Sequence, residues 1–318
     1  MSSSSADPLR VLYIVGAGRS GSTVLDTVLG NHPDTVSVGE LSELHRSAWL
    51  DNEYCACGQP AGDCDFWSAV RSTWQQLAPG GSVEGYLALR GRFERLRSGA
   101  LLRSFHARLH RTRALTAYLE QTAALFEAIG RVSGRRVIVD SSKNPLRAAW
   151  LSRIPSIDLR IIHLVRDSRG VAWSRKKALA RDVEAGVGHS LAAHPAWYSV
   201  VYWTITNLLS ARIRRRRRKH GVLVRYEDFV SQPETELARI GRACDLDCSG
   251  IARALAGGEA FPVGHTVAGN RLRMAGRVTL KADWEWLERL PTADRRICWA
   301  LSGWLLKRYG YPRQSRAA

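Results

Sequence analysis

The residues best suited to chemistry lie near the start of the chain, in the stretch GAGRSGST at positions 16–23, here called the phosphate loop. A glycine-rich turn that leads into a helix presents backbone amides without a partner inside that helix. The helix dipole adds partial positive charge at the same point. Arg19 supplies a full positive charge, and Ser20, Ser22 and Thr23 supply hydroxyl groups. This combination predicts a binding site for a phosphate or sulfate group.

The phosphate loop matches only part of the motif of P-loop nucleoside triphosphatases. Gly16 and Gly21 have the required spacing, but Ser22 stands where that motif needs a lysine for the β- and γ-phosphates. The plain alternative is a tight strand-to-helix turn with a solvated Arg19. Because glycines, arginine and hydroxyl groups occur together, we favour an anion site that does not belong to an ordinary nucleoside triphosphatase.

The elements that must hold this loop are a strand and a helix. Residues 11–15 form an apolar, β-branched run typical of a buried parallel strand, and residues 24–29 have a helical pattern. Further short apolar runs predict four more strands, at residues 35–38, 136–139, 158–165 and 222–225. The sequence therefore predicts an α/β protein with a P-loop-like three-layer fold, in which helices flank a central parallel β-sheet.

Polar side chains follow three of these strands. Glu40 comes after the second strand, Lys143 after the third, and Arg166 and Ser174 after the fourth. Because the carboxyl ends of parallel strands meet at one edge of a sheet, we expect these residues near the phosphate loop. Arg166 and Ser174 together would form a second anion site. The alternative for Lys143 is a solvated side chain beside a helix cap formed by a neighbouring serine.

Three cysteines lie close together in an unusual segment at residues 54–67. Cys55, Cys57 and Cys64 could provide three of four zinc ligands, but no fourth ligand stands at a standard spacing. We therefore favour a loop with two close thiols and packed aromatic side chains, and we predict no metal site.

Composition limits the class of protein. The chain has 318 residues, is 45% hydrophobic and carries a formal charge of +18, which favours a polyanionic ligand or surface. We expect a disordered tail at residues 1–9 and a single domain at residues 10–318, with a helical insertion at about 84–131. The sequence shows neither an apolar membrane span nor a secretory signal, and its cysteines are sparse. These features predict a cytoplasmic protein.

Two basic segments follow later in the chain. Residues 212–219 are almost all arginine or lysine and close a predicted helix, where cations suit the helix dipole. A solvated helix end is the favoured interpretation, and a surface for nucleic acid or anionic membrane is the alternative. Residues 264–277, here called the late loop, contain Arg271, Arg273 and Arg277, and we expect this loop to lie on a ligand.

The motifs GAGRSGST, DSSKNP, HLVRDSRGVAWS and GNRLR occur in this order over roughly residues 10–310. In this combination the chain resembles the sulfotransferases that use 3′-phosphoadenosine 5′-phosphosulfate. More narrowly, it is similar to the bacterial branch related to the carbohydrate and tyrosylprotein sulfotransferases, in which the segment with the three cysteines also recurs. The resemblance implies transfer of a sulfuryl group from this donor to a hydroxyl group of a small-molecule, sugar or peptide acceptor, without a metal.

The resemblance also implies roles for individual residues. The phosphate loop would hold the 5′-phosphosulfate, Arg166 and Ser174 would hold the 3′-phosphate, and Lys143 would lie beside the bridging oxygen. Tyr226 and residues 269–273 of the late loop would close over the adenosine and its 3′-phosphate. The donor-binding residues implied are Gly18, Arg19, Ser20, Gly21, Ser22, Thr23, Arg166, Ser174, Tyr226, Asn270, Arg271 and Arg273.

The catalytic base is left open by the resemblance. The tyrosylprotein enzymes use the second glutamate of a Gly-Glu-Glu motif, and Leu41 occupies that position here. Glu40 is the candidate base, and Glu43 and His45 are its rivals. We expect the helices at residues 84–131 and the loop at residues 182–195 to line the acceptor pocket, with the aromatic residues Tyr86, Phe93, Phe105, His106 and Trp197.

Two other functions compete with this interpretation. A nucleotide kinase is disfavoured by the missing lysine and because Asp140 is the only candidate for the magnesium-binding carboxylate. A protein that binds nucleic acid through residues 212–219 is disfavoured because the aromatic residues do not alternate with the basic ones. We therefore expect no nucleic-acid partner.

Overall fold

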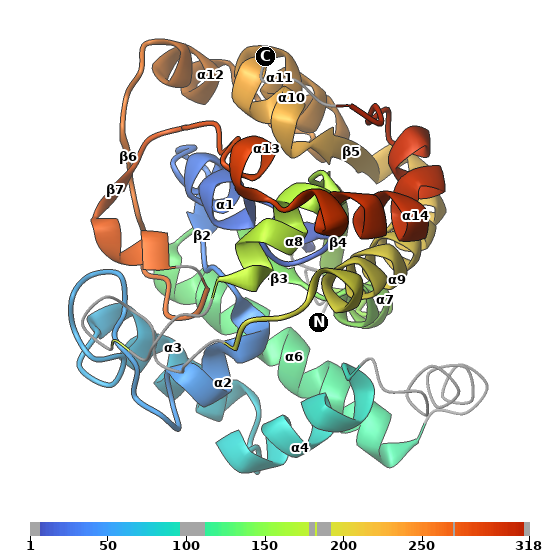
Figure 1. Cartoon of the computed structure of the whole chain (residues 1–318). Helices are drawn as coiled ribbons and strands as arrows, with labels where there is room; N and C mark the ends of the chain where they lie inside the picture. Colours follow the sequence, from blue (N-terminus) through green and yellow to red (C-terminus); the bar gives the residue numbers. More distant parts are fainter. Residues whose placement is uncertain (1–6, 96–111, 178–181, 183–191, 270, 315–318) are drawn as a thin grey trace.

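The structure is a computed structural model that describes residues 7–95, 112–177, 182, 192–269 and 271–314. A five-stranded sheet with the order β2-β3-β1-β4-β5 lies at its centre, and all neighbouring strands are parallel (Figure 1). All five predicted strands are confirmed. Their bounds are β1 Leu9–Val15, β2 Thr35–Ser37, β3 Val137–Lys143, β4 Ile157–Val165 and β5 Gly221–Arg225.

The apolar run of β1 is explained by burial on both faces of the sheet. Val11 and Tyr13 belong to one hydrophobic core, Leu12 and Ile14 belong to another, and all four side chains are fully buried. Successive side chains of a strand point to opposite faces, so a stretch covered on both sides favours apolar residues at every position.

Helices cover both faces of the sheet, which confirms the predicted three-layer fold. The first core contains helices α3 (Asp65–Leu77), α4 (Val83–Phe93), α6 (Arg113–Ser133) and α7 (Pro145–Leu151). The second core contains α1 (Ser22–Gly30), α10 (Tyr226–Ser231), α11 (Pro233–Cys244) and α12 (Ser249–Ala256). The predicted helical insertion corresponds to α4 and α6.

Three further helices pack together beyond β4. They are α8 (Ser168–Lys176), α9 (Ala196–Arg216) and α14 (Thr292–Arg308), and they enclose a small core around Trp203. No helix in the described part of the chain is long and apolar enough to cross a membrane. The shorter elements are η1 (Leu41–Glu43), α2 (Leu44–Ser47), η2 (Arg218–His220), β6 (Phe261–Pro262), η3 (Arg271–Ala275), β7 (Arg277–Val278) and α13 (Trp286–Arg289).

The basic run at residues 212–219 spans the end of α9 and the start of η2. Arg214 is half-buried, and burial together with the charge of Arg215 lowers its pKa. Arg217 donates a hydrogen bond of 3.1 Å to the carbonyl oxygen of Ser152. These two arginines pack within the fold. The exposed positions 212, 215, 216, 218 and 219 agree with the favoured interpretation of a solvated helix end.

Candidate active site

A cavity of about 960 Å³ lies where the strands β1, β3 and β4 end. Its wall is formed by the phosphate loop, the ends of the neighbouring strands and the late loop. Cationic side chains outnumber acidic ones in this wall, as a site for a polyanion requires. The cationic residues are Arg19, Arg46, Lys143, Arg166, Lys177, Arg271, Arg273, Arg277 and Lys281, and the acidic residues are Glu40, Glu43, Glu53 and Asp283.

The phosphate loop needs glycine where it meets the rest of the sheet edge. Gly21 has a φ of 88°, and a Cβ atom there would lie 2.5 Å from the ring of Tyr226. It is the N-cap of α1 and makes no side-chain cap, so no side chain of its own blocks the first amides of the helix. Ser20 is buried, and its hydroxyl has no hydrogen-bond partner among the described residues. The loop therefore has the free amides and the unpaired hydroxyl that favour an anion at a helix N-terminus.

Arg19, Ser174 and Arg166 converge as the sequence predicted. The Nε of Arg19 donates to the Oγ of Ser174 at 2.9 Å, and an Nη of Arg166 donates to the carbonyl oxygen of Arg19 at 3.3 Å. Arg166 also lies over the ring of Tyr226, 4.7 Å from its centre. Burial lowers the pKa of Arg19, and the positive charges of Arg166 and Arg175 lower it further. A bound anion would relieve this repulsion.

Asp283 is a cavity residue that the sequence gave no reason to select. Its carboxylate lies 3.0 Å from an Nη of Arg166, and the same nitrogen donates to its carbonyl oxygen at 2.9 Å. Burial acts to raise the pKa of Asp283, but Arg166 prevails and the pKa is lowered. The contact spans 117 positions of the chain, and no motif marks the aspartate. It joins the segment after the late loop to the end of β4.

Lys143 and Glu40 form an ion pair in the cavity, with 2.5 Å between Nζ and Oε1. Lys143 ends β3 with a φ of 64°, and Glu40 precedes η1, which follows the neighbouring strand β2. The predicted serine cap is wrong, because Asn144 accepts the amide hydrogen bonds that begin α7. Lys143 is therefore fixed toward the cavity by the strand.

The two rivals of Glu40 are in different surroundings. Glu43 lines the cavity, but its carboxylate is paired with Arg90 at 2.5 Å. His45 is fully buried and stacks on Tyr86 with 4.0 Å between the ring centres. Burial and the charge of Arg147 hold the pKa of His45 well below its usual value. Of the three candidates, Glu40 is the one that lines the cavity beside Lys143.

The family model described as the sulfotransferase family matches residues 12–250. The chain belongs to the sulfotransferase family. No sequence among the curated proteins matches it. Its solved structural relatives include the sulfotransferase domain of the Synechococcus PCC 7002 olefin synthase, with 19% identity, 98% of each chain covered and a TM-score of 0.48.

Two other solved structures similar to this sulfotransferase are more distant in sequence. Sulfotransferase STF9 from Mycobacterium avium has 12% identity and a TM-score of 0.48, with 98% of this chain and 79% of that chain covered. A sulfotransferase from Alicyclobacillus acidocaldarius has 14% identity and a TM-score of 0.38, with 93% and 96% covered.

The family match ends before the late loop of this sulfotransferase. Within the loop, Arg271 lines the cavity. Arg273 is 1% exposed and donates to the carbonyl oxygen of Tyr54 at 2.6 Å, which ties the loop to the segment with the three cysteines. Asn270 lies outside the described residues. Arg273, which was predicted to bind the donor, thus also holds the late loop to a distant segment of the chain.

The predicted acceptor residues do not form a pocket in the described part of the sulfotransferase. Tyr86 and Phe93 are buried in the core between α4, α6 and α7. Trp197 is 53% exposed on α9 and is absent from the cavity wall. Phe105 and His106 lie outside the described residues. The prediction is therefore wrong for Tyr86 and Phe93, because aromatic residues at helical spacing also serve a core. It is wrong for Trp197 because this side chain lies on the surface, outside the cavity wall.

Asp140 also lies away from the cavity. It is fully buried on β3, accepts a 2.9 Å hydrogen bond from the amide of Ser142 and lies 3.5 Å from the guanidinium of Arg147. Burial raises its pKa, although Arg147 opposes the rise. This carboxylate is committed to the core and is poorly placed to hold a magnesium ion beside a nucleotide.

Proposed function

We propose that this sulfotransferase moves the sulfuryl group of 3′-phosphoadenosine 5′-phosphosulfate to a hydroxyl group of a small-molecule, sugar or peptide acceptor. The observation that supports this most directly is the convergence of two anion sites and a carboxylate–lysine pair in one cavity. Arg19 and Arg166 mark the anion sites, and Glu40 and Lys143 form the pair.

The donor would span the two anion sites. The amides of the phosphate loop and Arg19 would hold the 5′-phosphosulfate, as expected for an anion at a helix N-terminus. Arg166 would bind the 3′-phosphate through two parallel hydrogen bonds, with Ser174 as a further donor. Tyr226 lies between Gly21 and Arg166 and would contact the nucleotide. Arg271 would approach it from the late loop.

In the proposed reaction the acceptor oxygen attacks sulfur while its proton passes to a carboxylate oxygen of Glu40. The bond between sulfur and the bridging oxygen of the 5′-phosphate breaks, and its electron pair stays on that oxygen. The products are a sulfate ester and adenosine 3′,5′-bisphosphate. The ammonium of Lys143 would stabilise the negative charge that grows on the bridging oxygen.

The ion pair between Lys143 and Glu40 gives each partner a second function. Lys143 holds the Glu40 carboxylate toward the cavity through this ion pair. When the donor binds, its phosphosulfate would attract the same ammonium group. Glu40 would then be available to the acceptor proton at the moment when the donor is in place.

Titration calorimetry with adenosine 3′,5′-bisphosphate, without added metal, tests the donor site. We expect 1:1 binding, and ATP with magnesium should bind far more weakly. A preference for ATP with magnesium would contradict the proposal and favour a kinase. Binding of neither nucleotide would also contradict it and direct attention to the basic surface at residues 212–219. A positive result would be followed by transfer of labelled sulfate from the donor to a panel of alcohols, sugars and peptides.

A further inference from the structure

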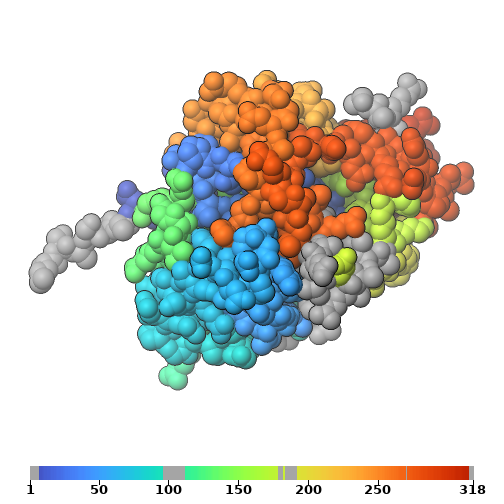
Figure 2. Space-filling model, turned by 90° about the vertical axis from the view of Figure 1, so that its left-hand side faces the viewer, coloured from blue at the N-terminus to red at the C-terminus, as the bar shows by residue number. Residues whose placement is uncertain are grey.

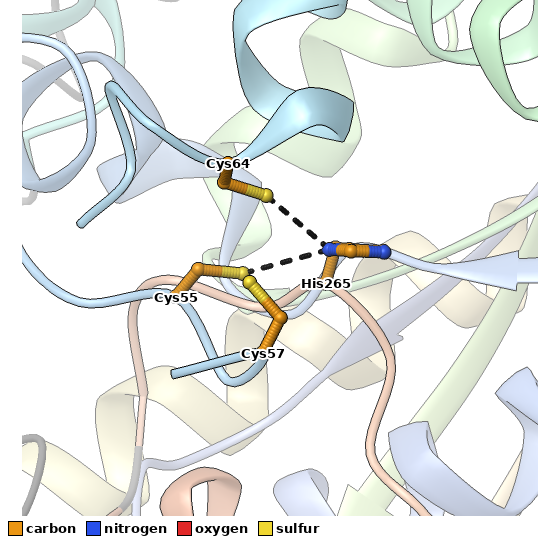
Figure 3. A group of neighbouring side chains, drawn as sticks. All are labelled: Cys55, Cys57, Cys64 and His265. Atoms are coloured by element: carbon orange, nitrogen blue, oxygen red, sulfur yellow. Dashed lines mark hydrogen bonds between the residues drawn. The ribbon is translucent and has the colours of Figure 1, made fainter. Parts of the chain in front are cut away.

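In the structure, a fourth potential metal ligand lies beside the three cysteines of residues 54–67. The Sγ atoms of Cys55, Cys57 and Cys64 and one ring nitrogen of His265 all lie within 4.8 Å of one another (Figure 3). The Nδ1 of His265 is 3.3 Å from the Sγ of Cys64 and 3.8 Å from that of Cys55. His265 follows Cys64 by 201 positions, which is why no spacing motif marks it.

The size and chemistry of this cluster fit one transition metal. With Zn–S bonds of about 2.3 Å and a Zn–N bond of about 2.0 Å at tetrahedral angles, ligand atoms lie roughly 3.5–3.8 Å apart. The two sulfur–nitrogen distances, 3.8 Å and 3.3 Å, are close to this separation. Three thiolates and an imidazole are ligands for zinc rather than for magnesium or calcium, which prefer oxygen. Four protein ligands leave no open position, as in structural zinc sites.

The surroundings of the four residues also hold their side chains in the positions that a metal site needs. The ring of His265 stacks on Phe66, with ring centres 5.1 Å apart and planes inclined by 17°, which fixes its orientation. Cys64 is the N-cap of α3 and its side chain makes no capping hydrogen bond, so the start of the helix fixes the place of a thiol that is not used by the helix. Gly58 has a φ of 86°, and its amide donates to the carbonyl oxygen of Cys55 at 2.9 Å. This tight turn brings Cys55 and Cys57 to the same side.

The cluster joins two segments that also touch through the backbone. The amide of Ala56 donates to the carbonyl oxygen of Thr266 at 2.8 Å, and Arg273 donates to that of Tyr54 at 2.6 Å. Figure 2 shows the orange late loop lying directly on the blue and cyan segment that holds the cysteines. A metal at this point would close a cross-link between the late loop and the first third of the chain.

We propose that Cys55, Cys57, Cys64 and His265 bind one zinc ion, and that this ion holds the late loop in its place beside the cavity. All six cysteines of the chain carry free thiols, so the cluster thiols are available as ligands. The site would have a structural role, because it lies outside the wall of the cavity. The proposal does not depend on the identity of the donor or the acceptor.

Metal analysis of the purified full-length protein tests the proposal. Protein produced in zinc-supplemented medium and purified without chelators under reducing conditions should contain one zinc ion per chain by mass spectrometry. Cys64→Ser and His265→Ala should lose most of the zinc, and His265→Cys should retain it. Cys248→Ser is the matched control, because this buried thiol lies outside the cluster. Zinc-free wild-type protein, or unchanged zinc in Cys64→Ser and His265→Ala, would overturn the proposal.

Cobalt substitution of the wild-type protein keeps the test valid if the variants do not fold. Replacing zinc with Co²⁺ should give the intense sulfur-to-cobalt charge-transfer absorption and the visible bands of a tetrahedral thiolate site. Lack of these bands, or a disulfide between two of the cluster cysteines in the native protein, would overturn the proposal. Removal of zinc by a chelator should also accelerate tryptic cleavage after Arg271, and an unchanged cleavage rate would contradict the role assigned to the ion.

Discussion

The two walls of the cavity are built in different ways. The sheet wall consists of the phosphate loop, Lys143 and Arg166, which directly follow or end strands of the parallel sheet. The loop wall consists of the late loop and residues 278–283, and side-chain contacts to distant segments hold it. These contacts include those of Arg273 with Tyr54 and of Asp283 with Arg166. In the proposed mechanism Lys143 therefore lies on the sheet wall, and the loop wall would enclose the nucleotide.

The largest effect should come from Glu40, which the two walls share: it follows β2, and a Cβ atom at Gly269 of the late loop would lie 3.2 Å from its carboxylate. Glu40→Gln should lower kcat by about 10²–10⁴-fold, because the base is lost. The affinity for adenosine 3′,5′-bisphosphate should change little. Glu43→Gln is the matched control and should keep kcat within a few-fold. Comparable loss of kcat in the control, or an active Glu40→Gln, would place the base elsewhere.

Arg166 connects the walls, so its removal should impair binding on both sides. Arg166→Ala should weaken the binding of adenosine 3′,5′-bisphosphate by roughly 100-fold, since a charge-assisted hydrogen bond contributes about 1.5–3 kcal/mol and Asp283 also loses its partner. Calorimetry measures the change. Arg10→Ala, which removes a guanidinium paired with Asp158 and Asp245, is the control and should bind as the wild type does. Unchanged affinity in Arg166→Ala would remove Arg166 from the nucleotide site.

Substitution of Arg273 tests how much the loop wall by itself contributes to nucleotide binding. Arg273→Ala should weaken nucleotide binding by about 10-fold, because a loop that loses the hydrogen bonds of a buried guanidinium must be ordered when the nucleotide binds. The effect should be smaller than that of Arg166→Ala. Arg253→Ala, on the exposed side of α12, serves as the control for the loss of one charge. A loss in Arg273→Ala as large as that in Arg166→Ala would erase the distinction between the walls.

The last expected effect concerns the stability of the fold, not catalysis or binding, and lies in the helix behind the phosphate loop. Burial raises the pKa of Asp26 in α1 to about 7, although a hydrogen bond from Ser37 opposes the rise. Because the folded state holds this proton more tightly than the unfolded state, its stabilising contribution is present below pH ~4 and is lost as the pH rises toward 7. The free energy of unfolding therefore falls by at most about 1.4 kcal/mol for each pH unit.

Denaturant unfolding at several pH values measures this contribution. Asp26→Asn carries no proton that can be lost, so its free energy of unfolding should rise relative to that of the wild type between about pH 5 and pH 7. Asp34→Asn, at an exposed position, should follow the wild type. Parallel pH profiles for Asp26→Asn and the wild type would show that this carboxyl does not titrate in that range.

The sheet wall could be predicted from the sequence because its signals are local. An apolar run followed by GAGRSGST encodes strand, loop and helix together, and Arg166 follows its strand directly. The loop wall could not be predicted in the same way. Asp283 and His265 act through partners more than 100 positions away, and neither residue stands in a motif. The burial of His45 among aromatic rings likewise depends on how α2 packs on α3 and α4.

The ion pair between Lys143 and Glu40 has a consequence for the order in which substrates add. An acceptor that arrives first meets a carboxylate already engaged by an ammonium group, whereas an acceptor that follows the donor meets one that has been released. The proposed mechanism therefore requires ordered addition, with the donor first and the bisphosphate leaving last. In initial-rate measurements the bisphosphate should then compete with the donor and inhibit noncompetitively against the acceptor.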